Sequence, residues 1–122
     1  MAEPVGWGRV LTCFSDRHDA MAVIRRLSNE WADRYGVDWP QFGRQTPVNS
    51  ETWSHERVGR HLDALALLVP ELITDLPPRR MTGPLVLIDF GQGKVGQIDG
   101  RRRANLWRDI PGEYEVLRIM VA

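Results

Sequence analysis

The residues best suited to chemistry lie together in one stretch, residues 95–105, VGQIDGRRRAN. The pattern predicts a strand, a tight Asp-Gly turn, and a helix whose first residues are three arginines. A helix N-terminus already attracts anions through its unpaired amides and its dipole, so arginines there become favourable when an anion binds. Guanidinium groups offer paired donors to phosphate. The stretch therefore predicts a phosphate-binding site made of Asp99, Gly100, Arg101, Arg102, Arg103 and Asn105.

A second interpretation of the same arginines stays open. They could cover a solvated surface and form ion pairs with acidic residues nearby, namely Asp99, Asp109 or Glu113. Sequence alone gives this interpretation the same weight as the phosphate site.

Other motifs that carry chemistry are missing from the sequence. His55 and His61 are six residues apart, which does not place two metal ligands on one helix face, and the single Cys13 cannot build a structural zinc site. The glycines at 91 and 93 lack the Lys-Ser/Thr pair of a phosphate loop and fit a hairpin turn. There is no Gly-x-Ser-x-Gly elbow. We therefore predict no metal site and no catalytic residues.

Charge is balanced overall but unevenly distributed. The formal net charge is zero, and fifteen of the sixteen basic residues are arginine, a bias typical of a bacterial chain from a high-GC genome. Residues 79–108 hold seven basic residues against two acidic ones. Neutrality disfavours a strongly basic nucleic-acid binder and an acidic DNA mimic. A local patch could still contact nucleic acid or a protein partner through Arg79, Arg80, Trp107 and Arg108.

The size and composition indicate one globular domain spanning residues 1–122, with 43% hydrophobic and 26% charged residues. No apolar run is long enough to cross a membrane, and the first residues lack the pattern of a secretory signal. A single cysteine gives no internal disulfide. We expect a cytoplasmic protein with Cys13 as a small buried residue near a strand end.

The first two thirds of the chain predict mainly helices. A short strand is expected within residues 5–14, whose apolar part is residues 10–14, and Ser15 or Asp16 would cap the helix that follows. The apolar stripe of that helix is Ala20, Ile24, Leu27, Trp31 and Tyr35, and Gly36 ends it. His18 would stand in its first turn. Residues 37–52 should form a loop with Trp39 and Phe42 packed against the protein.

A second helix is expected from about Ser54 to Pro70, and Pro70 could open one more helical turn. Its stripe is Trp53, Val58, Leu62, Leu65 and Val69.

After residue 83 the pattern changes to strands. Residues 85–88 and 95–98 predict a hairpin, residues 101–108 a short helix, and residues 114–121 a final strand. The predicted fold class is α+β, with two N-terminal amphipathic helices packed on a small mixed sheet that carries a short inserted helix.

Residues 83–121 resemble the core of the ParB/sulfiredoxin-like superfamily. The shared features are Pro84 before an apolar strand, a hairpin, Ile98-Asp99-Gly100, arginines with Ala104 entering a helix, and a closing strand. The resemblance implies a nucleotide-phosphate pocket in which Gly100 lets the backbone approach phosphate and Arg102 and Arg103 hold the phosphates. After the glycine, sulfiredoxins carry a catalytic cysteine, and partition-type and kinase-type members carry a glutamate. This chain has Arg101 there, so we expect binding without catalysis.

Three functions follow as expectations. The first is a non-catalytic domain that binds phosphate or a nucleotide, with the base left open. The second is a small protein-interaction inhibitor from a mobile element, similar to an anti-CRISPR protein. Five tryptophans favour it, because tryptophan and arginine are common at interface hot spots, and Trp7, Trp39, Trp53 and Trp107 are not all needed on the helical stripes. The third is nucleic-acid contact through the arginine patch.

Overall fold

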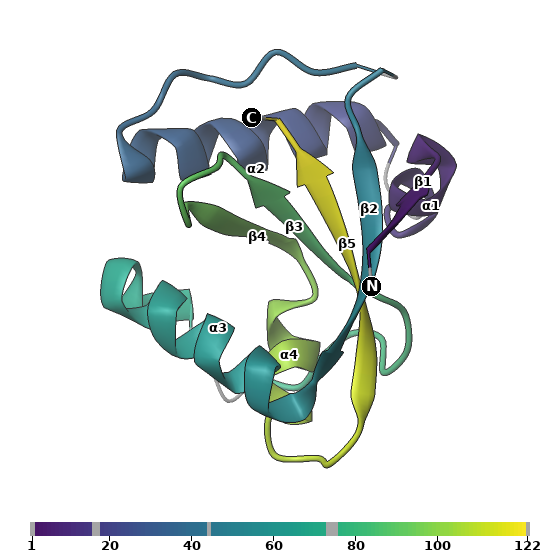
Figure 1. Cartoon of the computed structure of the whole chain (residues 1–122), viewed down its shortest axis with the longest axis vertical. Helices are drawn as coiled ribbons and strands as arrows, with labels where there is room; N and C mark the ends of the chain where they lie inside the picture. The colour runs from purple at the N-terminus through teal and green to yellow at the C-terminus, as the bar shows by residue number, and fades with distance from the viewer. Residues whose placement is uncertain (1, 16–17, 44, 73–75, 122) are drawn as a thin grey trace.

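The computed structural model describes residues 2–15, 18–43, 45–72 and 76–121, which form an α+β fold (Figure 1). Within these ranges, four α-helices and a short 3-10 helix surround a five-stranded mixed sheet. The strand order is β1 (Glu3–Val5), β2 (Val48–Ser54), β5 (Glu113–Met120), β3 (Leu85–Asp89) and β4 (Val95–Asp99). The central strand β5 runs parallel to β3 and antiparallel to β2. The α+β class and the mixed sheet are confirmed.

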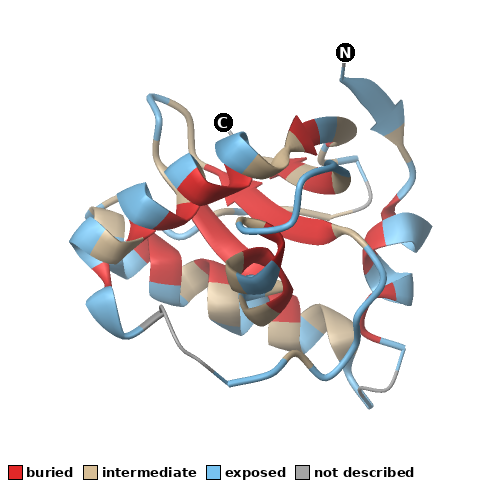
Figure 2. Ribbon diagram, turned by 90° about the horizontal axis from the view of Figure 1, so that it is seen from below, coloured by how far each residue is buried: buried red, intermediate tan, exposed pale blue. Residues whose placement is uncertain are grey.

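Helices cover the sheet on both faces. Helices α1 (Trp7–Thr12) and α2 (Ala20–Tyr35) pack on one face, where Val86 and Ile88 of β3 join their core. Helices α3 (His55–Leu68) and α4 (Arg101–Trp107) pack on the other face, where Leu85 and Leu87 lie. Alternate residues of β3 thus serve opposite cores, as the two-residue period of a strand requires. Figure 2 shows the buried residues gathered on the sheet and on the inward sides of the helices.

Helix α2 is capped at both ends by residues suited to those positions. The Asp19 carboxylate caps the helix by accepting a hydrogen bond from the Ala22 amide at 3.1 Å, and Gly36 ends it in the left-handed conformation at φ 68°. The predicted stripe and the Gly36 end are confirmed. The prediction that Ser15 caps this helix is wrong, because Asp19 is the cap. Asp16, the other predicted cap, lies outside the described residues. His18 precedes the cap and so is not in the first turn.

Two aromatic side chains anchor α2 to the edge strand β4. The Trp31 indole donates to the Gln97 carbonyl at 2.9 Å, and the Tyr35 hydroxyl donates to the Val95 carbonyl at 2.6 Å. Gly96 makes room for the indole, because a Cβ there would lie only 2.5 Å from Trp31 Cγ. These contacts fix α2 along residues 95–97 of β4, just before the arginine-rich stretch.

Helix α3 and the elements after residue 83 follow the predictions. The Ser54 hydroxyl caps α3 by accepting from the Arg57 amide at 3.2 Å, and Pro70 opens the 3-10 helix Pro70–Leu72. The β3–β4 hairpin, α4 and β5 lie within a residue or two of their expected bounds. Trp53 is the exception, because it belongs to β2 and packs toward α3 from the sheet.

The strand predicted within residues 5–14 is wrong, because Trp7–Thr12 forms helix α1 and the first strand, Glu3–Val5, ends where the predicted one begins. Trp7, Val10 and Phe14 are spaced by three and four residues, so a helical turn buries all three on one side. Cys13 is buried as expected, but it follows a helix and not a strand.

The expected loop at residues 37–52 is wrong in its second half, because β2 begins at Val48. This strand pairs with β5 along its whole length, from Val48 opposite Ile119 to Ser54 opposite Glu113. Phe42 stacks on Trp7 with ring centroids 5.6 Å apart, whereas Trp39 is 58% exposed and is not packed down.

No helix within the described ranges is both long and apolar enough to span a membrane.

Candidate anion-binding site

A cavity of about 440 Å³ lies between α2 and the junction of β4 with α4. Residues 78–80 and the end of α1 complete its wall. The cavity brings together most of the residues that the sequence singled out. Its lining includes Arg79, Arg80, Asp99, Gly100, Arg101, Arg102 and Arg103.

The cavity concentrates positive charge on a neutral protein. Its described lining holds seven arginines and two carboxylates, Glu30 and Asp99, a formal charge of +5, whereas the whole chain has a formal charge of zero. Five of the arginines were expected from the sequence. The other two, Arg26 and Arg34, come from α2 and were missed. Their spacing of eight residues, with Glu30 midway, places them on one helix face beside the apolar stripe.

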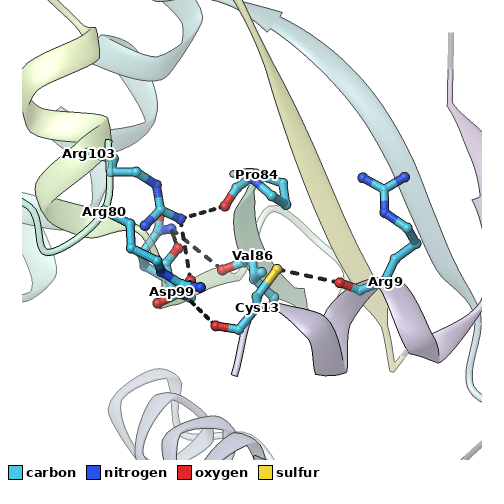
Figure 3. Close-up of polar contacts among 8 residues, drawn as sticks. Arg9, Cys13, Arg80, Pro84, Val86, Asp99 and Arg103 are labelled. Carbon is cyan, nitrogen blue, oxygen red and sulfur yellow. Dashed lines mark hydrogen bonds and ion pairs between the residues drawn. The ribbon is translucent and has the colours of Figure 1, made fainter. Parts of the chain in front are cut away.

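Arg103 forms the inner wall of the cavity. Its side chain is only 6% exposed, and Nη2 donates to the Pro84 carbonyl at 2.7 Å and lies 3.3 Å from Asp99 Oδ2 (Figure 3). Its Nε has no hydrogen-bond partner in the described part of the chain. These contacts tie the start of α4 to the start of β3. Arg103 therefore holds this wall of the cavity in place, and its Nη2 is already bonded to Pro84 and Asp99.

Asp99 lies between two arginines. Figure 3 shows the guanidinium groups of Arg80 and Arg103 turned toward its carboxylate. Arg80 Nη2 lies 3.5 Å from Asp99 Oδ2 and also donates to the Cys13 carbonyl, which holds residue 80 against the end of α1. The ion-pair interpretation is thus right for Asp99 with Arg103.

The remaining arginines are not neutralised in this way. Arg79, Arg101 and Arg102 form no ion pair with any residue that the structure describes. Asp109 and Glu113, the other proposed partners, form none with residues 101–103 within the same ranges. Within the described residues Arg34 forms none either, so four cationic groups at this cavity are free to bind an anion.

Gly100 is required by the turn and by Arg103. Its φ of 91° lies in the left-handed region, and a Cβ would come within 2.8 Å of Leu85 Cδ2 and 2.9 Å of Arg103 Nη2. The glycine lets the chain leave β4 and bring α4 close to β3. This is a positioning role, in addition to the approach to phosphate that the resemblance implies.

Three of the predicted residues lie away from the cavity. Asn105 is half-buried on α4 and is not part of the described lining. Trp107 is buried and stacks on Tyr114 with centroids 4.4 Å apart. Arg108 binds Asp63 of α3 at 2.7 Å. The predicted contact set is therefore divided, with Arg79 and Arg80 at the cavity and Trp107 and Arg108 beside α3.

Cys13 lines the cavity but is poorly suited to act as a nucleophile. Burial raises the pKa of its thiol, and the Asp99 carboxylate raises it further, while Arg80 and Arg103 oppose the shift. Sγ donates to the Arg9 carbonyl at 3.4 Å, as a protonated thiol does. The group is therefore a neutral part of the wall at neutral pH.

A polar pair, half-buried His61 and buried Gln97, supports the cavity from the opposite face of the sheet. His61 Nε2 donates to Gln97 Oε1 at 2.8 Å, and the Gln97 side-chain amide donates to the Asp99 carbonyl. Burial lowers the pKa of His61 below its ordinary value of 6.5. The hydrogen bond to Gln97 opposes this shift by raising the pKa, whereas the charges of Arg118 and Arg57 lower it further. Neutral His61 thus helps to fix the end of β4.

The tryptophans do not form the surface patch that a protein-interaction inhibitor would use. Trp7, Trp31, Trp53 and Trp107 are all buried, and only Trp39 is exposed. Of the four tryptophans thought to be spare, Trp7, Trp53 and Trp107 are part of the two hydrophobic cores, and Trp39 belongs to neither.

Comparison of the chain with protein-family models, with curated proteins and with solved structures gives no match. The resemblance of residues 83–121 to the ParB/sulfiredoxin-like superfamily therefore depends on their sequence motif alone.

Proposed function

We propose that this protein binds a small phosphate-bearing ligand, such as a nucleotide, in the arginine-lined cavity and does not transform it. One observation carries the proposal: seven arginines from separate segments converge on one cavity of a neutral chain. Like charges at such a site repel one another, and a bound anion relieves that repulsion. Each charged hydrogen bond from a guanidinium to phosphate contributes about 1.5–3 kcal/mol where water is partly excluded.

Binding without catalysis agrees with the groups around the cavity. Asp99 is held between Arg80 and Arg103, Glu30 lies beside Arg26 at 3.5 Å, and the Cys13 thiol is protonated. No histidine lines the cavity within the described ranges. A general base would need a group poised to exchange a proton with the ligand, and these residues are engaged elsewhere or neutral.

The family resemblance supports the same site. In the ParB/sulfiredoxin-like superfamily, nucleotide phosphates bind at the turn that corresponds here to residues 99–103. Arg101 replaces the catalytic cysteine or glutamate of that family, which again favours binding alone.

Thermal unfolding with ligands tests the proposal. The ligands are CTP, ATP, GTP and their diphosphates, and the variant Arg102→Ala removes one unpaired cavity arginine. Arg60→Ala is the matched control, because Arg60 is exposed on α3 and does not line the cavity. A ligand at about a hundred times its Kd stabilises the folded state by about 2.7 kcal/mol, which raises Tm by several degrees.

We expect a shift in the wild type and in Arg60→Ala, and a much smaller one in Arg102→Ala. Absence of a shift with every phosphate ligand, or an equal shift in Arg102→Ala, would overturn the proposal.

Nucleic-acid contact is the alternative that uses the same arginines. Its other predicted residues, Trp107 and Arg108, lie beside α3 and not at the cavity, so the structure favours the small ligand. Affinity for an oligonucleotide that exceeds the affinity for every mononucleotide, and that falls steeply with salt, would favour the alternative.

A further inference from the structure

The amount of charge at the cavity points to a ligand with several phosphate groups. A single phosphate carries about 1.5–2 negative charges at neutral pH, whereas the described lining has a formal charge of +5. One phosphate would leave a net charge of about +3 at the cavity without a counter-charge. A chain of phosphates brings further charge with each added group and neutralises more of them.

The arrangement of the arginines also fits an extended anion. Arg26 and Arg34 come from α2, Arg79 and Arg80 from the segment before β3, and the remaining three from the start of α4. Because the arginines come from three segments of the wall, a ligand that carries charge along its length is suited to contact them together.

The rest of the lining offers little that could recognise a nucleobase. Its aromatic residues are Phe14 and Trp31, which are only 5% and 2% exposed. Base recognition by stacking needs an accessible aromatic ring, and these rings are packed into the core. A guanidinium can stack on a base, but it does so on any base and gives no selection.

The amide and carboxylate side chains that could bind the edge of a base are already engaged. Gln97 is buried and bonded to His61 and to the Asp99 carbonyl. Asp99 itself is paired with Arg80 and Arg103, and Glu30 with Arg26. A site that selects one base places free donors and acceptors against it, because unpaired polar groups penalise the wrong base.

Building on the proposed phosphate site, we infer that this cavity recognises a phosphate chain and not a base. Its ligands are polyphosphates, either inorganic or the phosphate tail of any nucleotide. Affinity depends on the number of phosphates, and the four bases are equivalent.

Isothermal titration calorimetry on the full chain tests the inference. The probes are orthophosphate, pyrophosphate, tripolyphosphate, and then ATP, CTP, GTP and UTP, all in one buffer of fixed salt without divalent cations. We expect affinity to rise with each added phosphate, by about tenfold or more from orthophosphate to tripolyphosphate. Tripolyphosphate and the four nucleotides should agree within roughly threefold, less than 1 kcal/mol.

A double variant examines the part that α2 plays. Arg26→Gln/Arg34→Gln should weaken tripolyphosphate binding by about tenfold or more, while the exposed Arg60→Gln should leave it unchanged. Circular dichroism confirms that each variant is folded. Equal tripolyphosphate affinity in a folded double variant would contradict the extended contact.

The outcomes separate the inference from the proposed function. If one nucleotide binds more than about tenfold tighter than tripolyphosphate and the other nucleotides, the site recognises the base of that nucleotide. The inference then fails and the phosphate site stands. If no probe binds, the proposed function fails and the inference fails with it. If inorganic chains bind and the nucleotides do not, the ligand is inorganic polyphosphate.

Discussion

Substituting alanine at Gly96 should detach α2 from the edge strand that carries the site. A Cβ at this position would lie 2.5 Å from Trp31 Cγ and 2.7 Å from Cδ2, both far inside van der Waals contact. The ring cannot move away easily, because Trp31 is fully enclosed in the core and its indole is bonded to the Gln97 carbonyl at 2.9 Å.

The size of the effect follows from two contributions. Overpacking of a close-packed core costs about 1–3 kcal/mol, and a strained or broken indole hydrogen bond adds about 1 kcal/mol. We therefore expect Gly96→Ala to lower the free energy of unfolding by about 2–4 kcal/mol, measured by urea unfolding. Ligand affinity should fall too, because Arg26 and Arg34 move with α2.

Gly8→Ala is the matched control. Gly8 lies within α1, and a Cβ there meets nothing within 4 Å. The same substitution should therefore stabilise the protein by about 0.5–1 kcal/mol, because alanine loses less entropy in a helix than glycine. If Gly96→Ala unfolds within about 0.5 kcal/mol of the wild type, the packing of Trp31 against β4 is not what holds α2.

Three further predictions concern single side chains. Arg103→Met should lower the free energy of unfolding by about 1–3 kcal/mol, because it leaves the Pro84 carbonyl unpaired and Asp99 with Arg80 alone; an unchanged urea midpoint would contradict this. Burial lowers the pKa of His61 below 6.5, so the folded state binds fewer protons than the unfolded state just below that pH, and stability should fall as pH falls through this window. His61→Gln should flatten this dependence in urea titrations at several pH values, and an equally steep dependence in the variant would assign it to other groups. Cys13 should react with a thiol reagent much more slowly in the native protein than in urea, because it is buried and protonated; equal rates would show an accessible thiolate.

The sequence predicted those elements whose signal is local. The stripe from Ala20 to Tyr35 has a clear helical period, and Gly36 supplies the usual end. The apolar run at 85–88, the glycine turn and the Asp-Gly turn likewise define β3, β4 and the start of α4 from neighbouring residues. The junction of β4 with α4 also contains the predicted site residues 99–103.

The elements that were missed depend on distant partners. β2 has the sequence VNSETWS, in which only Val48 and Trp53 are buried, so its extended state depends on pairing with β5, whose residues are 59 to 71 positions away. Helix α1 contains part of a short apolar run that fits a strand or a helix equally well, and burial against the sheet decides between them.

Part of the cavity lining likewise depends on a contact between residues far apart in the sequence. Residues 99–103 were recognisable because their arginines are consecutive. Arg26 and Arg34 reach the cavity only because Trp31 packs on Gly96 and places α2 across from α4. A glycine in β4 and a tryptophan in α2 give no sign of this contact when read separately.

The most direct test of the phosphate site is an NMR titration of the labelled protein with tripolyphosphate. Amide and guanidinium resonances are followed at each addition. We expect saturable shifts confined to residues 26–34, 79–80 and 97–103, with the shift of the Arg102 side chain among the largest. Shifts centred on α3 and Arg108, or no saturable shifts at all, would contradict it.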